Sequence, residues 1–151
     1  MHPPRRLLRN AAFVLLGGII GTFLRAGLDV ALTGGELSTT TLLACNVVGS
    51  LALGFLLRAL ELSPLAATEG LQRLRLFAGT GIIGGFTSYS SFAFVSGSFA
   101  TAAVPIAGTF YALLTVVSGV AAALIGTMIV PGSRRDDIRQ GDIRRGGSGR
   151  A

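Results

Sequence analysis

The sequence predicts an all-α membrane protein with four transmembrane helices, the third of which breaks near its middle. Three observations predict this class. The 151 residues are 50% hydrophobic and only 13% charged, with a mean hydropathy of +0.67, whereas soluble domains carry about 25% charged residues. No Asp, Glu, Lys or Arg lies between Gly79 and Gly132, a stretch long enough for two membrane spans of about 20 residues each. Glycines and hydroxyl side chains interrupt the third hydrophobic segment.

Four hydrophobic segments follow one another in a single predicted domain, residues 1–130. The expected spans are residues 9–32, 40–62, 71–99 and 101–130, joined by short connections. The first segment follows a basic start, as the apolar core of a signal peptide does, but no small-residue cleavage site stands cleanly after it, so we expect a retained helix. Residues 131–151 are charged and Gly-rich with almost nothing to bury, which predicts a disordered cytoplasmic tail.

The basic residues are distributed asymmetrically. All are arginine, and all except Arg25 lie before the first span, around the second connection or after the fourth span (Arg5, Arg6, Arg9, Arg58, Arg73, Arg75, Arg134, Arg135, Arg139, Arg144, Arg145 and Arg150). Cytoplasmic segments of membrane proteins carry the excess of Lys and Arg. The sequence therefore predicts a multi-pass protein of the cell (plasma) membrane with both termini in the cytoplasm.

Small residues recur at helical spacing in two spans. Gly17 and Gly21 lie one turn apart in the first span, and the fourth span carries a stripe of small residues (Gly108, Ala112, Thr115, Gly119, Ala122 and Gly126). In lipid, small residues let helices approach closely. Both patterns predict tightly packed helix faces.

The stretch GIIGGFTSYSSF, residues 81–92, predicts the break in the third span. Each glycine weakens a helix by about 1 kcal/mol relative to alanine, and the five consecutive hydroxyl side chains that follow (Thr87, Ser88, Tyr89, Ser90 and Ser91) offer the backbone other hydrogen bonds. We expect the break between Gly84 and Ser88, where freed carbonyls can coordinate a cation. Tyr89 and Phe92 then share a helix face, and their positive ring edges can tolerate a small anion; plain aromatic packing is the alternative.

Few other side chains suggest chemistry. Asn46 lies within the second span, where an amide needs partners; it either makes an interhelical hydrogen bond or faces a water-filled pathway. Cys45 is the only cysteine, which excludes an intrachain disulfide and favours a packing role. His2 is the only histidine. No Ser–His–acid triad or site for metal hydrolysis can be assembled, so we expect no enzyme.

Three stretches, GGIIGTFLRAGL, TLLACNVVGSLALG and GIIGGFTSYSSF, together with the Tyr…Thr…Gly pattern of the fourth span, resemble the CrcB/Fluc fluoride channel family. The resemblance extends from Gly17 to Gly126. It implies a fluoride-specific channel subunit that exports fluoride passively and lowers cytoplasmic fluoride. It also implies an antiparallel dual-topology dimer with two pores at the interface and a structural sodium ion between the subunits. No nucleic-acid partner is expected.

The resemblance also implies roles for individual residues. The sodium ion would be bound by the backbone carbonyls of Gly84 and Thr87. The fluoride pore would be lined by an asparagine, a pair of rings and a polar track (Asn46, Tyr89, Phe92, Ser90, Ser91, Tyr111 and Thr115). Arg25 matches the family's arginine at the end of the first span, a structural or vestibule charge. Tyr89 stands where the family has phenylalanine, which leaves open whether both pores conduct.

The arginine bias conflicts with one property that the resemblance implies. Single-gene homodimers of this family insert in both orientations, which requires nearly balanced flanking charge. We therefore expect a fixed orientation and a heterodimer with an oppositely oriented homologous subunit, with a homodimer as the alternative.

Two other function classes compete with the channel. A small multidrug or cation antiporter needs an intramembrane carboxylate, but every acidic residue lies at a span end, in a connection or in the tail (Asp29, Glu36, Glu61, Glu69, Asp136, Asp137 and Asp142). A non-conducting membrane subunit is the other alternative, and it predicts that Asn46 and Phe92 tolerate substitution.

Overall fold

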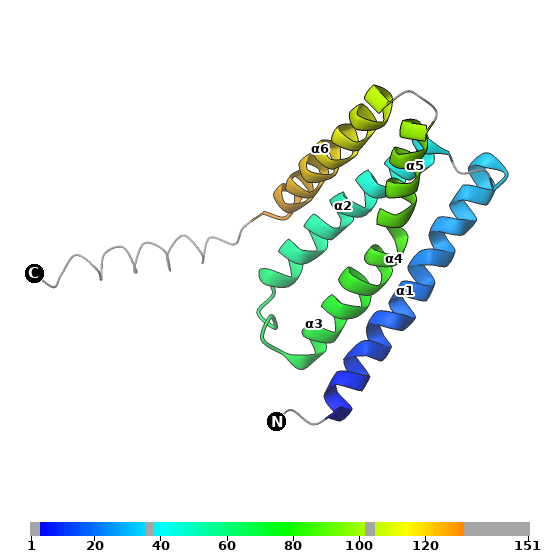
Figure 1. Cartoon of the computed structure of the whole chain (residues 1–151). Helices are drawn as coiled ribbons and strands as arrows, with labels where there is room; N and C mark the ends of the chain where they lie inside the picture. Colours follow the sequence, from blue (N-terminus) through cyan, green and yellow to red (C-terminus); the bar gives the residue numbers. More distant parts are fainter. Residues whose placement is uncertain (1–3, 36–37, 102–104, 132–151) are drawn as a thin grey trace, which may run out of the picture.

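The computed structural model describes residues 4–35, 38–101 and 105–131, and within these ranges the chain is helical, without strands (Figure 1). The helices are α1 (Pro4–Thr33), α2 (Thr39–Glu61), α3 (Glu69–Leu74), the π-helix η1 (Arg75–Ile83), α4 (Gly84–Phe86), α5 (Tyr89–Thr101) and α6 (Pro105–Ile129). The predicted all-α class is confirmed. The predicted tail lies outside the described residues, apart from Pro131.

Three helices of the described residues are long and apolar enough to cross a membrane: Arg5–Thr33, Thr39–Glu61 and Ile106–Ile129. They correspond to the first, second and fourth predicted spans. The third predicted span is divided, because α3, η1 and α4 continue one another up to Phe86 and α5 starts anew at Tyr89. The predicted break is therefore confirmed, and it lies at Thr87 and Ser88.

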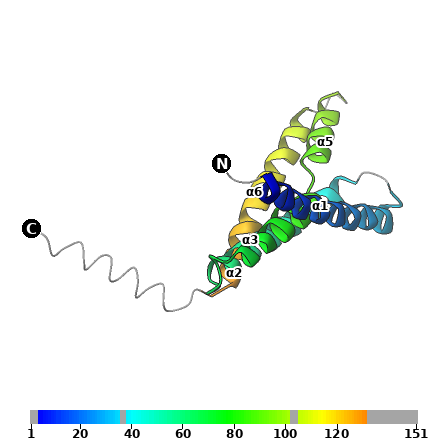
Figure 2. The same ribbon diagram turned by 90° about the horizontal axis from the view of Figure 1, so that it is seen from below.

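The break changes which helix the chain packs against. Before it, η1 and α4 pack against α1; after it, α5 packs chiefly against α6, which also packs along α2. Figures 1 and 2 show α5 diverging from α1 and following α6. Thr87 makes the turn with extended backbone angles (φ −79°, ψ 147°), which any residue can adopt. The interruption thus joins two helix pairs, α1 with η1–α4 and α5 with α6, around α2.

Glycines bring the helix backbones into direct contact. A Cβ on Gly81 would lie 2.8 Å from Gly17 Cα, and one on Gly17 would lie 2.9 Å from Gly81 Cα. On the other side of the molecule, a Cβ on Gly126 would lie 2.8 Å from Phe55 N, and the small-residue stripe of α6 is buried or half-buried along its length. Both faces that the sequence predicts to pack tightly do so, because only glycine leaves room for this approach.

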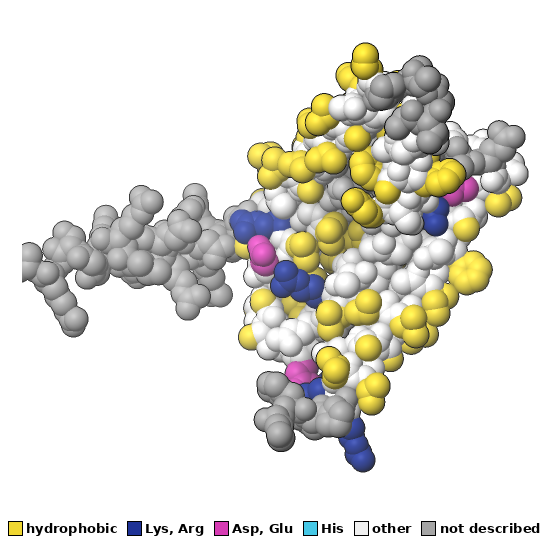
Figure 3. All heavy atoms as spheres, in the orientation of Figure 1, with side chains coloured by type: hydrophobic (Ala, Val, Ile, Leu, Met, Phe, Trp, Pro, Cys, Tyr) yellow, Lys and Arg dark blue, Asp and Glu magenta, His cyan; other side chains and the backbone are white. Residues whose placement is uncertain are grey.

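The charged residues lie at the two ends of the bundle. Arg6, Arg9 and Arg73 surround Glu69 at the end where α1 begins, and the Arg25–Asp29 pair lies toward the opposite end of α1. Figure 3 shows charged side chains at these two places and in a further group at the left of the view, with apolar and uncharged side chains over the face between them. Many of these apolar side chains are exposed, such as Phe23, Ile106 and Met128, as expected of surfaces in contact with lipid.

Candidate functional site

The break is organised by a serine cap. Ser88 Oγ accepts a hydrogen bond from Ser91 N–H (3.1 Å), and the Ser88 carbonyl accepts one from Phe92 N–H (3.2 Å). Ser88 is therefore the N-cap of α5, the role that serine favours because its side chain satisfies a backbone donor of the first turn. Ser91 Oγ also lies 2.8 Å from Ser88 Oγ, and Ser90 Oγ lies 3.4 Å from it. The hydroxyl run thus fixes the start of α5.

Asn46 of α2 is hydrogen-bonded to Ser88, the cap residue at the break. Its Oδ1 accepts a hydrogen bond from Ser88 N–H at 3.1 Å. Among the described residues, no group accepts a hydrogen bond from its Nδ2, and the side chain lines a groove of about 490 Å³. The first alternative drawn from the sequence, a hydrogen bond across the bundle, is therefore present, and Asn46 also lines a hollow.

The groove between α2 and η1 runs along the break. Its α2 wall carries Asn46, Gly49, Ser50, Leu53 and Leu57, and its other wall carries Arg75, Gly79, Thr80, Ile83, Gly84 and Thr87. We call this hollow the α2–η1 groove. Its polar residues extend from a charged end at Arg75 to the break at Thr87.

The two carbonyls predicted to bind sodium lie at the break. In a continuous helix Ser88 N–H would donate to the Gly84 carbonyl, but here it donates to Asn46. The Gly84 carbonyl instead accepts only a long contact from Thr87 Oγ1 (3.4 Å), and Ser91 N–H, which would serve the Thr87 carbonyl, donates to Ser88 Oγ. Both oxygens have therefore lost their helical donors. Carbonyl oxygens at a helix break are suitable ligands for sodium.

A row of aromatic rings crosses from α5 to α6. The ring centroids of Tyr89 and Phe92 are 5.8 Å apart, those of Phe92 and Tyr111 are 6.1 Å apart, and those of Tyr111 and Phe99 are 6.3 Å apart. Tyr111 is only 6% exposed, and its hydroxyl has no hydrogen-bond partner among the described residues. A buried hydroxyl without a partner is costly, which favours a ligand at this position over a purely structural role.

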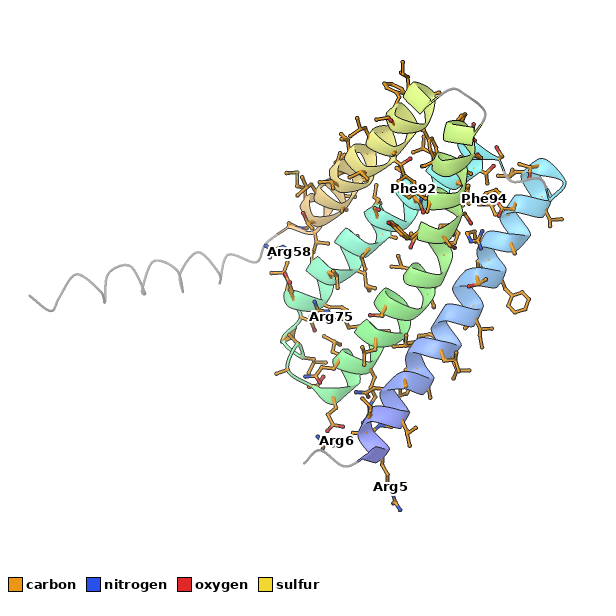
Figure 4. The ribbon with its side chains drawn as sticks, viewed as in Figure 1. Arg5, Arg6, Arg58, Arg75, Phe92 and Phe94 are labelled. Atoms are coloured by element: carbon orange, nitrogen blue, oxygen red, sulfur yellow. The ribbon has the colours of Figure 1, made fainter. Side chains whose placement is uncertain are left out.

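A second hollow, of about 350 Å³, lies between α2, α5 and α6. It is lined by two rings, two hydroxyl residues and small apolar residues (Tyr89, Phe92, Ser50, Thr115, Val116, Gly119, Val120 and Ala123). We call it the α5–α6 hollow. Thr115 Oγ1 donates to the Tyr111 carbonyl at 2.8 Å, so its own donor is occupied within α6. Figure 4 shows Phe92 on the side of α5 that faces α2 and α6.

The structure brings most of the predicted site residues together. Asn46, Gly84, Thr87 and Ser91 meet at the break, and Ser90 is exposed beside it. Tyr89, Phe92, Tyr111 and Thr115 form the aromatic row and the α5–α6 hollow.

Arg25 lies apart from these groups. Arg25 Nη1 contacts Asp29 Oδ2 at 3.4 Å near the far end of α1, and the side chains are 19% and 14% exposed, respectively. The pair has no net charge.

Sequence reasoning missed some lining residues. It also gave no site role to Ser88, the cap of α5, although a serine just before a helical segment is a typical N-cap signal. Thr80 and Arg75 line the groove because η1 is a π-helix, whose i→i+5 hydrogen bonds widen the turn. No local pattern in the sequence indicates that widening.

Residues 12–127 match the family described as "CrcB-like protein, Camphor Resistance (CrcB)". The chain belongs to the CrcB family. The resemblance noted in the sequence is thereby confirmed.

Relatives of this CrcB chain are described as fluoride channels. It is 40% identical over 119 residues to "Fluoride-specific ion channel FluC 2" of Leifsonia xyli subsp. xyli (strain CTCB07), covering 78% of this chain and 81% of the relative. It is 39% identical over 130 residues to "Fluoride-specific ion channel FluC" of Novosphingobium aromaticivorans, covering 80% and 95%. Over 123 residues it is 37% identical to "Fluoride-specific ion channel FluC 1" of Rhodococcus jostii (strain RHA1), covering 81% and 86%.

These relatives are ion channels, a kind of protein that is not an enzyme. Together with the three membrane-capable helices of the described residues, membership of the family makes this chain a multi-pass membrane protein.

Proposed function

We propose that this chain is a subunit of a fluoride-specific channel that exports fluoride passively and lowers its concentration in the cytoplasm. The observation that carries the proposal is the match to the CrcB family over most of the chain, with relatives named fluoride-specific channels at up to 40% identity. The third predicted span, broken at Thr87 and Ser88, then completes four membrane crossings.

The free hydrogen-bond donors support this function. Fluoride is small and strongly hydrated, so a pore must replace lost water with donor groups. Near the proposed pathway, Asn46 Nδ2 and the buried Tyr111 Oη are donors that have no acceptor among the described residues, and the capped start of α5 adds the positive end of a helix dipole. We propose that Asn46, Tyr89, Ser90, Ser91, Phe92, Tyr111 and Thr115 line the fluoride pathway.

A sodium ion at the break fits the chain's own groups. Gly84 and Thr87 would hold it through the two carbonyls that lack helical donors. When bound, sodium supplies positive charge beside the pathway without lying in it. No arginine lies at the break itself, which suits conduction because a deep cation would hold an anion too long.

The assembly is proposed as an antiparallel dimer in the cell membrane, with both termini of this chain in the cytoplasm. The arginines of the described residues support a fixed orientation, because all except Arg25 lie at one end of the bundle. Since Arg25 is paired with Asp29, the far end contributes almost no opposing charge. We therefore propose an oppositely oriented homologous subunit as the partner; a homodimer is the alternative.

The antiporter alternative lacks the residue that it needs. Each carboxylate of the described residues is paired with arginine: Asp29 with Arg25, Glu61 with Arg58, and Glu69 with three arginines. A proton-coupled site requires a carboxylate that exchanges a proton for a cation inside the membrane.

The first test is fluoride efflux from liposomes that contain this chain, read with a fluoride electrode and with chloride as the control anion. Rapid efflux of fluoride but not chloride is expected from the chain with its partner subunit. Efflux from this chain alone would establish a homodimer and refute the proposed heterodimer. Absence of efflux both alone and with a co-expressed homologue would refute the channel.

Two variants separate a conducting from a non-conducting subunit. Asn46→Ala is expected to reduce fluoride efflux at least tenfold, the size of effect that one lost hydrogen bond to an ion can have. Phe92→Ala removes the ring edge proposed to face the pathway and is expected to reduce efflux as well. Val48→Ala is the matched control, because Val48 follows Asn46 by two residues in α2 and is 58% exposed. If Asn46→Ala and Phe92→Ala conduct like Val48→Ala, these residues do not line a pathway.

A further inference from the structure

Two arginines of the described residues have no carboxylate partner. Arg6, Arg9 and Arg73 contact Glu69, Arg58 contacts Glu61, and Arg25 contacts Asp29. Within the part of the chain that the structure describes, this leaves Arg5 and Arg75 unpaired. Figure 4 shows Arg5 pointing away from the bundle, whereas Arg75 lies between η1 and α2. Arg75 is exposed, and it lines the α2–η1 groove.

The π-helix places Arg75 on the same groove wall as the residues that lead to the break. This segment contributes six residues to the groove: Arg75, Gly79, Thr80, Ile83, Gly84 and Thr87. Within η1, Arg75 is followed four and five residues later by the pair Gly79 and Thr80. Toward the break, the pair Ile83 and Gly84 is followed four and three residues later by Thr87. Hydrogen bonds from i to i+5 widen the turn in this way, so Thr80 follows Arg75 on the same face. Arg75 and Thr80 therefore lie on the same wall of the groove as Thr87 at the break, with glycines and Ile83 between them.

Arg75 lines the end of the α2–η1 groove that lies away from the break, which we call its mouth. Twelve residues separate it from Thr87, which corresponds to about 18 Å at a helical rise of about 1.5 Å per residue. An arginine side chain is always charged. At this distance it cannot bind an ion held at the break, but a positive charge at the mouth raises the local concentration of anions that approach.

We propose that Arg75 is an anion-collecting residue: it attracts small anions to the basic end of the α2–η1 groove, from which they pass along Thr80 to Asn46. This inference rests on the proposed fluoride conduction. Arg75 differs from the other arginines of the described residues at this end because none of them lines the groove; Glu69 contacts three of them, and Glu61 contacts Arg58. The role is electrostatic, so it requires the charge of residue 75 and depends on ionic strength.

The test compares fluoride efflux from liposomes for the wild type, Arg75→Gln, Arg75→Lys and Arg5→Gln, in the assembly that conducts. At 0.01 M ionic strength the screening length is about 30 Å, and at 1 M it is about 3 Å. A unit charge about 10 Å from a passing ion changes the local concentration about twofold in water. Arg75→Gln is therefore expected to lower efflux about twofold at 0.01 M and to match the wild type at 1 M.

The control variants decide between charge and structure. Arg75→Lys keeps the charge and is expected to conduct like the wild type, and Arg5→Gln removes an unpaired charge that lies off the groove and is expected to have no effect. Equal efflux of Arg75→Gln and Arg5→Gln at 0.01 M would overturn the proposal. So would a loss in Arg75→Gln that persists at 1 M, since that indicates a structural role. A wild type that carries no fluoride in any assembly would refute the proposed function itself, and this inference with it.

Discussion

Two adjacent glycines of α1 provide a sharp test of the packing. A Cβ on Gly17 would overlap the carbonyl of Phe77 and lie 2.9 Å from Gly81 Cα and 3.0 Å from Ile82 N. All three are backbone atoms of η1 and cannot rotate away. A Cβ on Gly18 would have no heavy atom within 4 Å. Substituting alanine at the two positions should therefore have effects of opposite sign.

The expected magnitudes follow from two opposing terms. Alanine in place of glycine stabilises a helix interior by about 1 kcal/mol, and forcing an extra carbon into a packed site costs about 1–3 kcal/mol. Gly18→Ala should thus stabilise the protein by up to about 1 kcal/mol. Gly17→Ala should destabilise the protein by up to about 2 kcal/mol, which is the packing cost less the gain in helix propensity.

The assay is thermal unfolding in mild detergent, followed by far-UV circular dichroism. Gly17→Ala should unfold at a lower temperature than the wild type, and Gly18→Ala at the same or a higher temperature. Because η1 carries the groove wall, Gly17→Ala should also reduce fluoride efflux. Equal unfolding temperatures for the two variants would refute the close approach of α1 and η1.

Three further predictions concern the site. Tyr111→Phe removes a buried hydroxyl that has no protein partner, so it should leave the unfolding temperature unchanged or raise it while reducing fluoride efflux; a loss of stability would indicate a structural hydrogen bond. Ser88→Ala removes the cap of α5 and should cost about 1 kcal/mol in thermal unfolding; a silent substitution would argue against the cap. Arg25→Gln leaves Asp29 unpaired and should destabilise by about 1–3 kcal/mol, whereas the double variant with Asp29→Asn should recover part of that loss. Simple additivity in the double-mutant cycle would contradict the pairing.

Local sequence signals predicted the all-α class and the break. Three glycines and a hydroxyl run are sufficient to end a helix near Thr87, because both effects act on the backbone within a few residues. The small-residue stripe of α6 likewise follows from helical spacing alone. The orphaned Tyr111 hydroxyl could not be predicted, because its partners depend on how α5 and α6 meet.

Other features depend on contacts between distant residues. The hydrogen bond from Ser88 to Asn46 joins positions 42 residues apart, so the sequence could give only two alternatives for Asn46. The π-helical turn of η1 lies where Gly81 meets Gly17, a contact that no local pattern specifies. Arg75 joined the groove through that turn and was missed for the same reason.

The change of partner at Thr87 and Ser88 also affects how the chain assembles during synthesis. The segment from Arg75 to Phe86 packs against α1, which has already emerged from the ribosome. Helix α5 packs chiefly against α6, which is made only afterwards. Helices α1 and α2 and the η1–α4 segment can therefore associate while translation continues. Helix α5 completes its packing only after α6 has been made. The Ser88–Asn46 hydrogen bond, formed with α2 already in place, would hold the start of α5 during that interval.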